Sequence, residues 1–393
     1  MALAQRRDRR RAWSTVGALF VTQTVACGIL FYGPTVYLHA LTTQRGLALT
    51  VVSYATALLY LASGAAGFPI GRAIERYDPR VTMVASALIG GLGLIAVGTA
   101  SGLFLLFFGY AVLGVGLAGL SLVPGAVLVA RWFRADRALA MSVVSSGYSF
   151  GGVVIVPLVA WVVREQGLTA GSYWLGGLLL VGVVPITLAL VRTPSSDQPA
   201  RSVPSAHLSV RLRTNRVFVG VSLAWFFVMF GQVGILSHLF NLISGALTTG
   251  LAAAAVSTAA ITSLVGRLVA GWIMRYVSAW TFALGLMAWQ TASLLVLALG
   301  SDAVTLLLAT GAFGVTLGTM VMLQALILAE EFTGPGFTKV YSSSNFLATF
   351  GWAAGPAAIG VVHDLGGGYT AAVLMIAGTS LLANIVLAVV RPR

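Results

Sequence analysis

The sequence predicts an all-α membrane protein in which twelve transmembrane helices form two pseudo-symmetric six-helix bundles. Composition, a succession of long apolar runs and the placement of positive charges support this fold class. Hydrophobic residues make up 58% of the 393 residues and charged residues only 8%, and the mean hydropathy is +0.95. Because a soluble domain carries roughly a quarter charged residues, the composition excludes a soluble protein.

Long apolar runs, separated by short polar or basic clusters, mark the individual helices. Each run is long enough to cross a bilayer as a helix, and none alternates apolar and polar residues as a barrel strand does. The predicted spans are 13–40, 50–71, 81–100, 103–130, 138–163, 172–191, 216–243, 250–274, 279–299, 303–329, 338–362 and 370–390. The first run extends to about Leu41, which is far longer than the core of a signal peptide, so we interpret it as an uncleaved span.

All but three of the 23 Lys and Arg residues fall on one side of the membrane when the N-terminus is placed in the cytoplasm. The exceptions are Arg45 and Arg164 in outer loops and Arg267 inside the span 250–274. This asymmetry predicts an even number of spans, cytoplasmic N- and C-termini and residence in the plasma (cytoplasmic) membrane. The net charge of +13 therefore reflects membrane orientation, and we expect the lipid bilayer, not nucleic acid, as a partner.

The chain is predicted to consist of an N-terminal six-helix bundle at 1–192, a cytoplasmic linker at 193–214 and a C-terminal six-helix bundle at 215–393. The linker contains three prolines and several serines and is too short to form a domain. Phe-Gly pairs at 150–151 and 350–351 are among several features that repeat at an offset near 200 residues. Parallel repeats of this kind place a substrate site between the halves, near the bilayer midplane.

The segment after the second span resembles the loop signature of the major facilitator superfamily. It runs Gly67-Phe-Pro-Ile-Gly71-Arg72-Ala-Ile-Glu75-Arg76-Tyr-Asp78-Pro-Arg80, against a family pattern of Gly-x-x-x-Gly/Asp-Arg-x-Gly-Arg, and it departs from that pattern at Glu75 and Asp78. The resemblance covers residues 13–392 and implies secondary active transport by alternating access. It implies a conformational role for Gly67, Gly71, Arg72, Glu75, Arg76 and Arg80.

Two further stretches resemble the monocarboxylate and oxalate transporter branch of that superfamily. Ala-Arg-Trp-Phe at 130–133 with Gly-Tyr-Ser-Phe-Gly at 147–151 is similar to its span 4–5 pattern, and residues 350–369 are similar to its span 11–12 pattern. The resemblance implies a small organic anion as substrate, either a monocarboxylate such as lactate or pyruvate or a short dicarboxylate. In that branch an arginine of span 8 binds the substrate carboxylate, and Arg267 stands at the matching place.

Arg267 is also singled out by its own position. It lies eight residues before Arg275, so about 12 Å of helix separates it from the predicted cytoplasmic end. Burying a cation at such a depth costs roughly 2.5–3.5 kcal/mol on insertion scales, and a bound anion would offset that cost. The planar guanidinium suits bidentate binding of a carboxylate. The alternative is an arginine paired with helix carbonyls or facing a phosphate-binding groove.

Polar groups inside other spans are candidates for completing a substrate site with Arg267. The candidates are Tyr32, Tyr148, Gln232 and Asn345. Each can donate a hydrogen bond to a carboxylate or hydroxyl, and the alternative for each is a bond to a neighbouring helix. His238 is the candidate proton-linked group because imidazole titrates near neutral pH, with a histidine at the membrane interface as the alternative.

The coupling of transport stays open among proton symport, anion exchange and facilitated diffusion, so a proton is an optional partner. No Asp or Glu lies inside a predicted span, and Ser263 occupies the position one turn before Arg267 where the branch often has an aspartate. Thr35 follows Pro34 where the animal members of the branch have a lysine. Both departures argue against the proton mechanism of the animal members.

No catalytic residue, cofactor or metal is expected. Cys27 is the only cysteine, and the four histidines show no metal-ligand spacing. Clustered catalytic groups are lacking, so an enzyme is not expected, and we expect a monomer. Two alternatives remain: an exporter of hydrophobic or cationic drugs with the same fold, which an intramembrane acid would favour, and a non-transporting membrane sensor, which would need an output domain.

Overall fold

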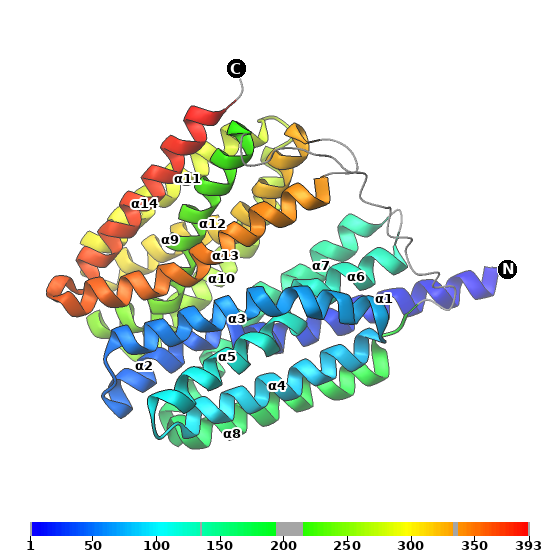
Figure 1. The fold of residues 1–393 in the computed structure, drawn as a ribbon, viewed down its shortest axis with the longest axis horizontal. Helices are drawn as coiled ribbons and strands as arrows, with labels where there is room; N and C mark the ends of the chain where they lie inside the picture. The colour runs from blue at the N-terminus through cyan, green and yellow to red at the C-terminus, as the bar shows by residue number, and fades with distance from the viewer. Residues whose placement is uncertain (1, 134–135, 194–214, 333–336, 392–393) are drawn as a thin grey trace. The chain divides into compact units, whose positions relative to one another are not determined.

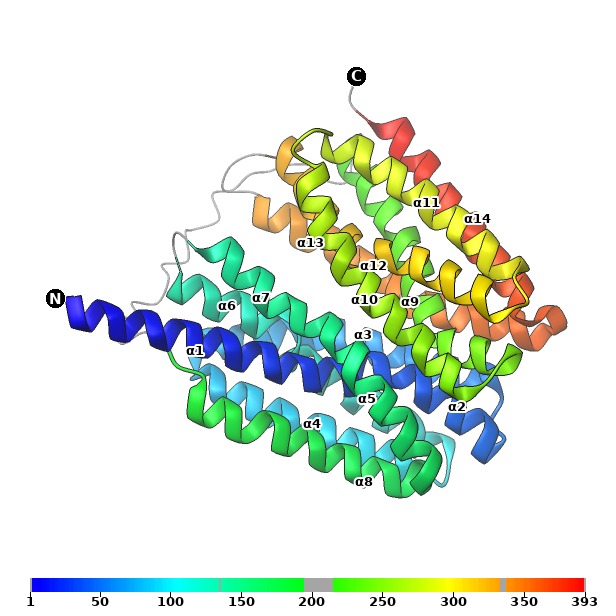
Figure 2. The same ribbon diagram turned by 180° about the vertical axis from the view of Figure 1, so that it is seen from behind.

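The computed structural model describes residues 2–133, 136–193, 215–332 and 337–391, and within these residues every regular element is helical. The helices of the first half are α1 (Ala2–Cys27), η1 (Gly28–Tyr32), α2 (Gly33–Arg45), α3 (Leu49–Arg76), α4 (Pro79–Thr99), α5 (Leu103–Leu120), α6 (Leu122–Trp132), α7 (Arg137–Phe150), η2 (Gly151–Ile155) and α8 (Val156–Leu190) (Figure 1). The helices of the second half are α9 (Arg216–Ala246), α10 (Thr249–Ile273), α11 (Ala279–Leu299), α12 (Ala303–Glu331), α13 (Phe337–Val362), η4 (His363–Gly367) and α14 (Gly368–Val390) (Figure 2). Apart from Thr193, the predicted linker lies outside the described residues.

Eleven stretches of the described chain are long and apolar enough to cross a membrane. One of them, Leu139–Leu190, has 52 residues, which is about 78 Å of helix and enough for two crossings. Its backbone leaves the helical region at Gly167, with φ 74° and ψ 166°, a conformation that glycine adopts easily. With this break, the described residues contain twelve spans, and the predicted fold class is confirmed.

The chain forms two compact units, which are described one at a time. The first contains residues 1–46 and 58–201, and the second contains residues 47–57 and 202–393. The start of α3 therefore belongs with the second unit. There the Thr50 amide donates to Asp364 Oδ2 at 2.8 Å, and the Thr50 hydroxyl donates to the Gly360 carbonyl at 2.9 Å.

Glycines allow close helix crossings in both units, as the Gly-x-x-x-Gly pairs at 147–151 and 351–355 would permit. In the first unit α1 and η2 meet so closely that a Cβ on Gly151 would lie 2.6 Å from the Thr24 carbonyl oxygen. In the second unit a Cβ on Gly355 would meet the Phe230 carbonyl oxygen of α9. Spans 5 and 11 thus lie close to their neighbours at these glycines. Figures 1 and 2 also show α4 beside α8 in the first unit, and α11 beside α14 in the second.

Arg45 and Arg164, the two basic residues predicted in outer loops, have local partners in the first unit. Arg45 donates to carbonyls at the end of α4, including that of Ala100 at 2.6 Å, and to the Thr169 hydroxyl at 3.1 Å. A cation is favourable there because the last carbonyls of a helix carry a partial negative charge. The exposed Arg164 pairs with Glu165 at 2.8 Å. Local partners thus account for two of the three exceptions to the charge asymmetry.

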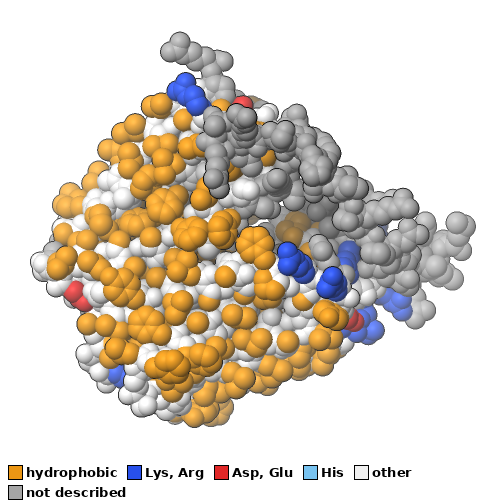
Figure 3. Space-filling model, viewed as in Figure 1, with side chains coloured by type: hydrophobic (Ala, Val, Ile, Leu, Met, Phe, Trp, Pro, Cys, Tyr) orange, Lys and Arg blue, Asp and Glu red, His pale blue; other side chains and the backbone are white. Residues whose placement is uncertain are grey.

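Apolar side chains cover much of the described surface. Figure 3 shows hydrophobic side chains spread over the face in view, with Lys and Arg atoms confined to a few small groups. Large exposed apolar residues occur on helices of both units, including Phe104 at 85% exposure and Leu308 at 69%. A soluble monomer rarely exposes so much contiguous apolar surface, whereas lipid tails cover it in an integral membrane protein.

Candidate functional site

Arg267 lies on α10, in the interior of a membrane-spanning helix. Six residues, or about 9 Å of helix, separate it from the end of α10 at Ile273. Its side chain is half-buried, and its Nη2 donates to the Ser263 hydroxyl one turn earlier at 3.4 Å. Its guanidinium also lies against the backbone of Gly318 on α12. The arrangement presents a permanently charged donor within an apolar bundle.

Gln232 on α9 belongs to a fully buried polar network that connects four helices. Its Nε2 donates to Gln290 Oε1 on α11 at 2.9 Å and to the Thr316 carbonyl on α12 at 3.2 Å. The Thr316 hydroxyl also donates to Gln290 Oε1 at 3.0 Å, and Gln290 Nε2 donates to Ser380 Oγ on α14 at 3.2 Å. The Gln232 amide nitrogen is thus engaged inside the bundle, and its role in substrate binding stays a prediction.

His238 on α9 is fully buried, which differs from a histidine exposed at a membrane interface. Its Nε2 lies 3.1 Å from the Pro356 carbonyl oxygen and 3.2 Å from Ser53 Oγ. Its Nδ1 lies 3.3 Å from the Tyr369 hydroxyl, which also accepts from Asn241 Nδ2 at 2.7 Å. A neutral imidazole protonated on Nε2 fits these partners, because a carbonyl can only accept. A proton-linked role for His238 stays a prediction.

Tyr32 and Tyr148, the two candidates in the first unit, lie together. Their ring centroids are 6.5 Å apart, and both rings pack edge-on against Phe31, at 5.1 Å and 4.8 Å. Tyr32 is buried and Tyr148 is half-buried. The structure thus joins two of the predicted substrate-binding residues in one aromatic cluster, whose hydroxyls are hydrogen-bonding groups.

Two π-helical turns, η1 and η2, adjoin this cluster. Each is followed closely by a proline, Pro34 and Pro157, whose missing N–H interrupts the regular helical ladder. The two turns touch at their backbones, since a Cβ on Gly28 would lie 2.8 Å from the Gly151 carbonyl oxygen. Because π-turns occur frequently at functional sites, this crossing supports a functional role for the aromatic cluster.

The remaining candidates lie on helix surfaces. Asn345 is exposed on α13, and Thr349 donates to its backbone carbonyl. The loop-signature residues occupy the end of α3 and the start of α4, where Gly67 and Gly71 have open space around them and Arg72 and Arg76 are exposed. In the same segment Arg80 lies 3.8 Å from Asp78, and the side chain of Glu75 lies outside the described residues.

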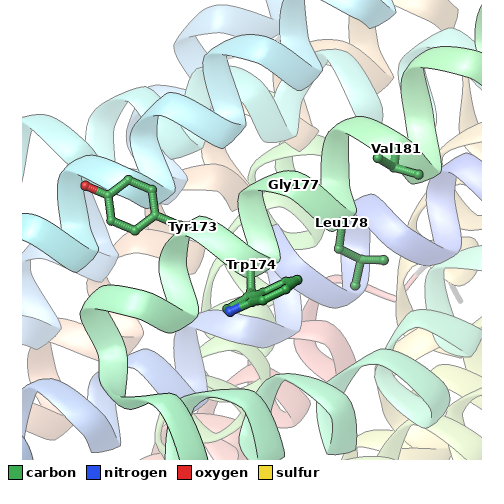
Figure 4. Close-up of a pocket in the computed structure, with 5 residues that line it drawn as sticks. All are labelled: Tyr173, Trp174, Gly177, Leu178 and Val181. Atoms are coloured by element: carbon green, nitrogen blue, oxygen red, sulfur yellow. The ribbon is translucent and has the colours of Figure 1, made fainter.

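A groove of about 540 Å³ runs along one face of α8 and is not suited to an anion. Figure 4 shows its lining, which comes from this helix alone: Tyr173, Trp174, Gly177, Leu178 and Val181. Trp174 and Val181 are 67% and 70% exposed. Such an apolar face on a membrane-spanning helix is covered by lipid chains.

Sequence reasoning missed three residues that act on the candidates. Gln290 and Thr316 hold Gln232, and Gly318 lies against Arg267. Each is distant in sequence from its partner, so no spacing signal exists. In the part of the chain that the structure describes, no group of three or more His, Cys, Asp or Glu side chains could hold a metal ion.

Several known proteins similar to this chain are transporters. The family model of the Major Facilitator Superfamily matches residues 18–332. Monocarboxylate transporter 13 of Bos taurus is 29% identical over 333 residues, which cover 81% of this chain and 75% of that protein. The oxalate:formate antiporter of Oxalobacter formigenes is 24% identical over 172 residues, which cover 43% of this chain and 40% of that protein. The solved structure of the nucleoside transporter NupG has the same fold, with a TM-score of 0.77 at 12% identity and coverage of 97% of this chain and 98% of that one.

Proposed function

This chain belongs to the Major Facilitator Superfamily, and we propose that it carries small organic anions across a membrane, with Arg267 binding their carboxylates. The family match and the transporter relatives make it a transport protein and not an enzyme. The proposed substrates are monocarboxylates such as lactate and pyruvate, or short dicarboxylates. They are the substrate classes suggested by the names of the monocarboxylate and oxalate:formate relatives.

The observation that carries the proposal is a half-buried guanidinium in the interior of α10. A cation at that depth is costly, and the residues kept despite such a cost usually serve a substrate or ion pathway. A carboxylate offsets the cost by forming two parallel hydrogen bonds to the guanidinium, each roughly twice as strong as a neutral one. A cationic or purely apolar substrate would gain nothing from this group.

The halves 1–192 and 215–393 would move against each other around the bound anion, with both chain ends in the cytoplasm. The charge pattern supports this orientation, because the basic residues of the even-to-odd connections would then all face the cytoplasm. The hydroxyls of Tyr32 and Tyr148, whose rings lie in one aromatic cluster, are proposed as further donors to the substrate.

The proposal is tested by uptake of labelled lactate, pyruvate and oxalate into proteoliposomes. Removing one partner of a buried charged pair costs about 2–5 kcal/mol, so we expect Arg267→Ala to lower uptake at least about thirtyfold. The matched control is Arg164→Ala, which removes an exposed charge that pairs with Glu165 and should leave uptake unchanged. Uptake that persists undiminished in Arg267→Ala, or its absence for every acid in the wild type, would contradict the proposed function.

A further inference from the structure

Helices α10 and α12 approach each other through glycines whose positions a larger residue could not occupy. A Cβ on Gly266 would meet the Val315 carbonyl oxygen, and a Cβ on Gly314 would lie 2.6 Å from the Ala259 carbonyl oxygen and 2.7 Å from its Cα. Real Cβ atoms essentially never approach other heavy atoms within 3.0 Å. The opposing atoms at Gly266 are backbone, and those at Gly314 are the Thr262 hydroxyl and the backbone of Ala259, so glycine serves the packing of the two helices.

Gly318 lies on the same helix as Gly314, one turn further along, but it opposes a different group. A Cβ there would overlap Nε of Arg267 and lie 2.6 Å from its Cζ and 2.7 Å from its Nη2. All three nearest atoms belong to the guanidinium and none to the backbone. The absent side chain of Gly318 therefore leaves the space that the charged end of Arg267 occupies.

Ser263, one turn before Arg267 on α10, also restricts the position of the guanidinium. Its hydroxyl accepts from Nη2 at 3.4 Å, and its side chain is buried. Because a hydroxyl is neutral, this contact directs the guanidinium without cancelling its charge. Ser263 and Gly318 together define where the cation lies, one by a hydrogen bond and the other by leaving room.

We propose that Gly318 is a positioning residue for substrate binding, which holds the Arg267 guanidinium where it can grip a carboxylate with both of its N–H edges. This inference rests on the proposed function of Arg267. A methyl group at position 318 would push the guanidinium away until normal contact distances are restored. Bidentate binding has a fixed geometry, and a misplacement of about 1 Å at a reacting or binding group can cost on the order of a hundredfold.

The contact between Gly318 and Arg267 predicts that a substitution at Gly318 changes substrate binding without changing stability. The flexible end of an arginine can move aside at little cost, so Gly318→Ala should fold and melt like the wild type. In Gly314→Ala the new methyl meets backbone of α10 that cannot move independently, so that variant should lose stability. The two substitutions add the same methyl group to the same helix face and differ only in what it meets.

The experiment measures uptake of lactate, pyruvate and oxalate, together with the melting temperature, for the wild type, Gly318→Ala and Gly314→Ala. We expect Gly318→Ala to raise KM about tenfold to a hundredfold with its melting temperature unchanged. We expect Gly314→Ala to lower the melting temperature while its folded fraction keeps the wild-type KM. In an Arg267→Ala background, Gly318→Ala should cause no further loss of uptake, because the group it positions is gone.

These measurements distinguish a failure of the positioning role of Gly318 from a failure of the anion site at Arg267. If Arg267→Ala abolishes uptake while Gly318→Ala keeps the wild-type KM, the positioning role is wrong and the anion site stands. A Gly318→Ala protein that unfolds as readily as Gly314→Ala, or that loses further uptake in the Arg267→Ala background, would also overturn the positioning role. If Arg267→Ala transports normally, the proposed function fails and this inference fails with it.

Discussion

Two polar regions of the second unit share helix α12 but differ in charge and burial. The first is the network around Gln290, whose members are neutral and at most 2% exposed, and which reaches α12 at Thr316. The second is the half-buried cation Arg267, which reaches α12 at Gly318. A neutral network buried on all sides fixes helices in place, whereas a partly accessible charge can exchange its surroundings for a ligand. Whether a polar residue inside a membrane protein holds helices together or can bind a ligand thus depends on its accessibility as well as on its type.

Breaking the neutral network should have the largest effect on stability and little effect on substrate binding. Gln290→Leu removes one acceptor of Gln232 Nε2 and the donor to Ser380 Oγ. We expect the free energy of unfolding to fall by about 2 kcal/mol, because buried polar groups lose their partners. Denaturant titration in detergent measures this change, and KM for the transported anion should change less than about twofold.

Ser293→Ala is the control on the same helix, since the Ser293 hydroxyl donates within α11, to the Trp289 carbonyl at 2.7 Å. It should leave the free energy of unfolding nearly unchanged. A Gln290→Leu protein with normal stability and a strongly raised KM would show that the network belongs to the substrate site, and the contrast between the two regions would be wrong.

Adding a negative charge beside Arg267 should give this cation a fixed partner within the protein, as the members of the neutral network have. In Ser263→Asp a carboxylate stands one turn from Arg267 and competes with the substrate for the guanidinium. We expect anion affinity to fall about tenfold at pH 7.5, equivalent to about 1.4 kcal/mol. Affinity should recover as the pH falls through the pKa of the new carboxyl, because protonation breaks the ion pair.

Ser263→Asn, which is similar in shape but neutral, separates charge from size in this test. It should keep most of the wild-type affinity and show no recovery at low pH. Equal losses in Ser263→Asp and Ser263→Asn, without any pH dependence, would mean that charge at Arg267 does not govern binding.

The smallest effect is expected at Asp302, which caps the start of α12 outside both regions. Hydrogen bonds from the Thr305 hydroxyl and from its backbone amide, the latter at 2.9 Å, hold the pKa of Asp302 below its ordinary value. Its contribution to stability is therefore present above the ordinary pKa of aspartate and disappears as the pH falls through the lowered one. We expect Asp302→Ala to melt slightly below the wild type at neutral pH and together with it in strong acid, with uptake unchanged. A changed KM would show that the start of α12 influences the site.

The fold and the main candidate were predictable from sequence, and their surroundings were not. Long apolar runs and the charge asymmetry report on single helices and on the membrane, so the twelve spans and the unusual depth of Arg267 could be predicted. The partners Gln290 and Gly318 depend on which helix faces which, and they lie 58 and 51 positions from Gln232 and Arg267. A glycine in an apolar run gives the same signal whether it meets lipid, backbone or a guanidinium.

The break at Gly167 shows the same limit at the level of a single residue. Sequence placed two spans on either side of it, at 138–163 and 172–191, and the structure has a helix from Val156 to Leu190 with one non-helical glycine. The predicted spans therefore end too early before Gly167 and begin too late after it. A polar stretch between two spans does not end a helix when glycine alone can make the turn. His238 is a further case, since its burial depends on Ser53, Pro356 and Tyr369 from three other helices.

The most direct test of the anion site is an experimental structure of the protein bound to 2-bromopropionate, a monocarboxylate whose bromine can be located independently. We expect the bromine signal next to α10 and both carboxylate oxygens about 2.7–2.9 Å from the nitrogens of the Arg267 guanidinium. A bromine signal elsewhere, with Arg267 hydrogen-bonded only to protein groups or to lipid, would contradict the account.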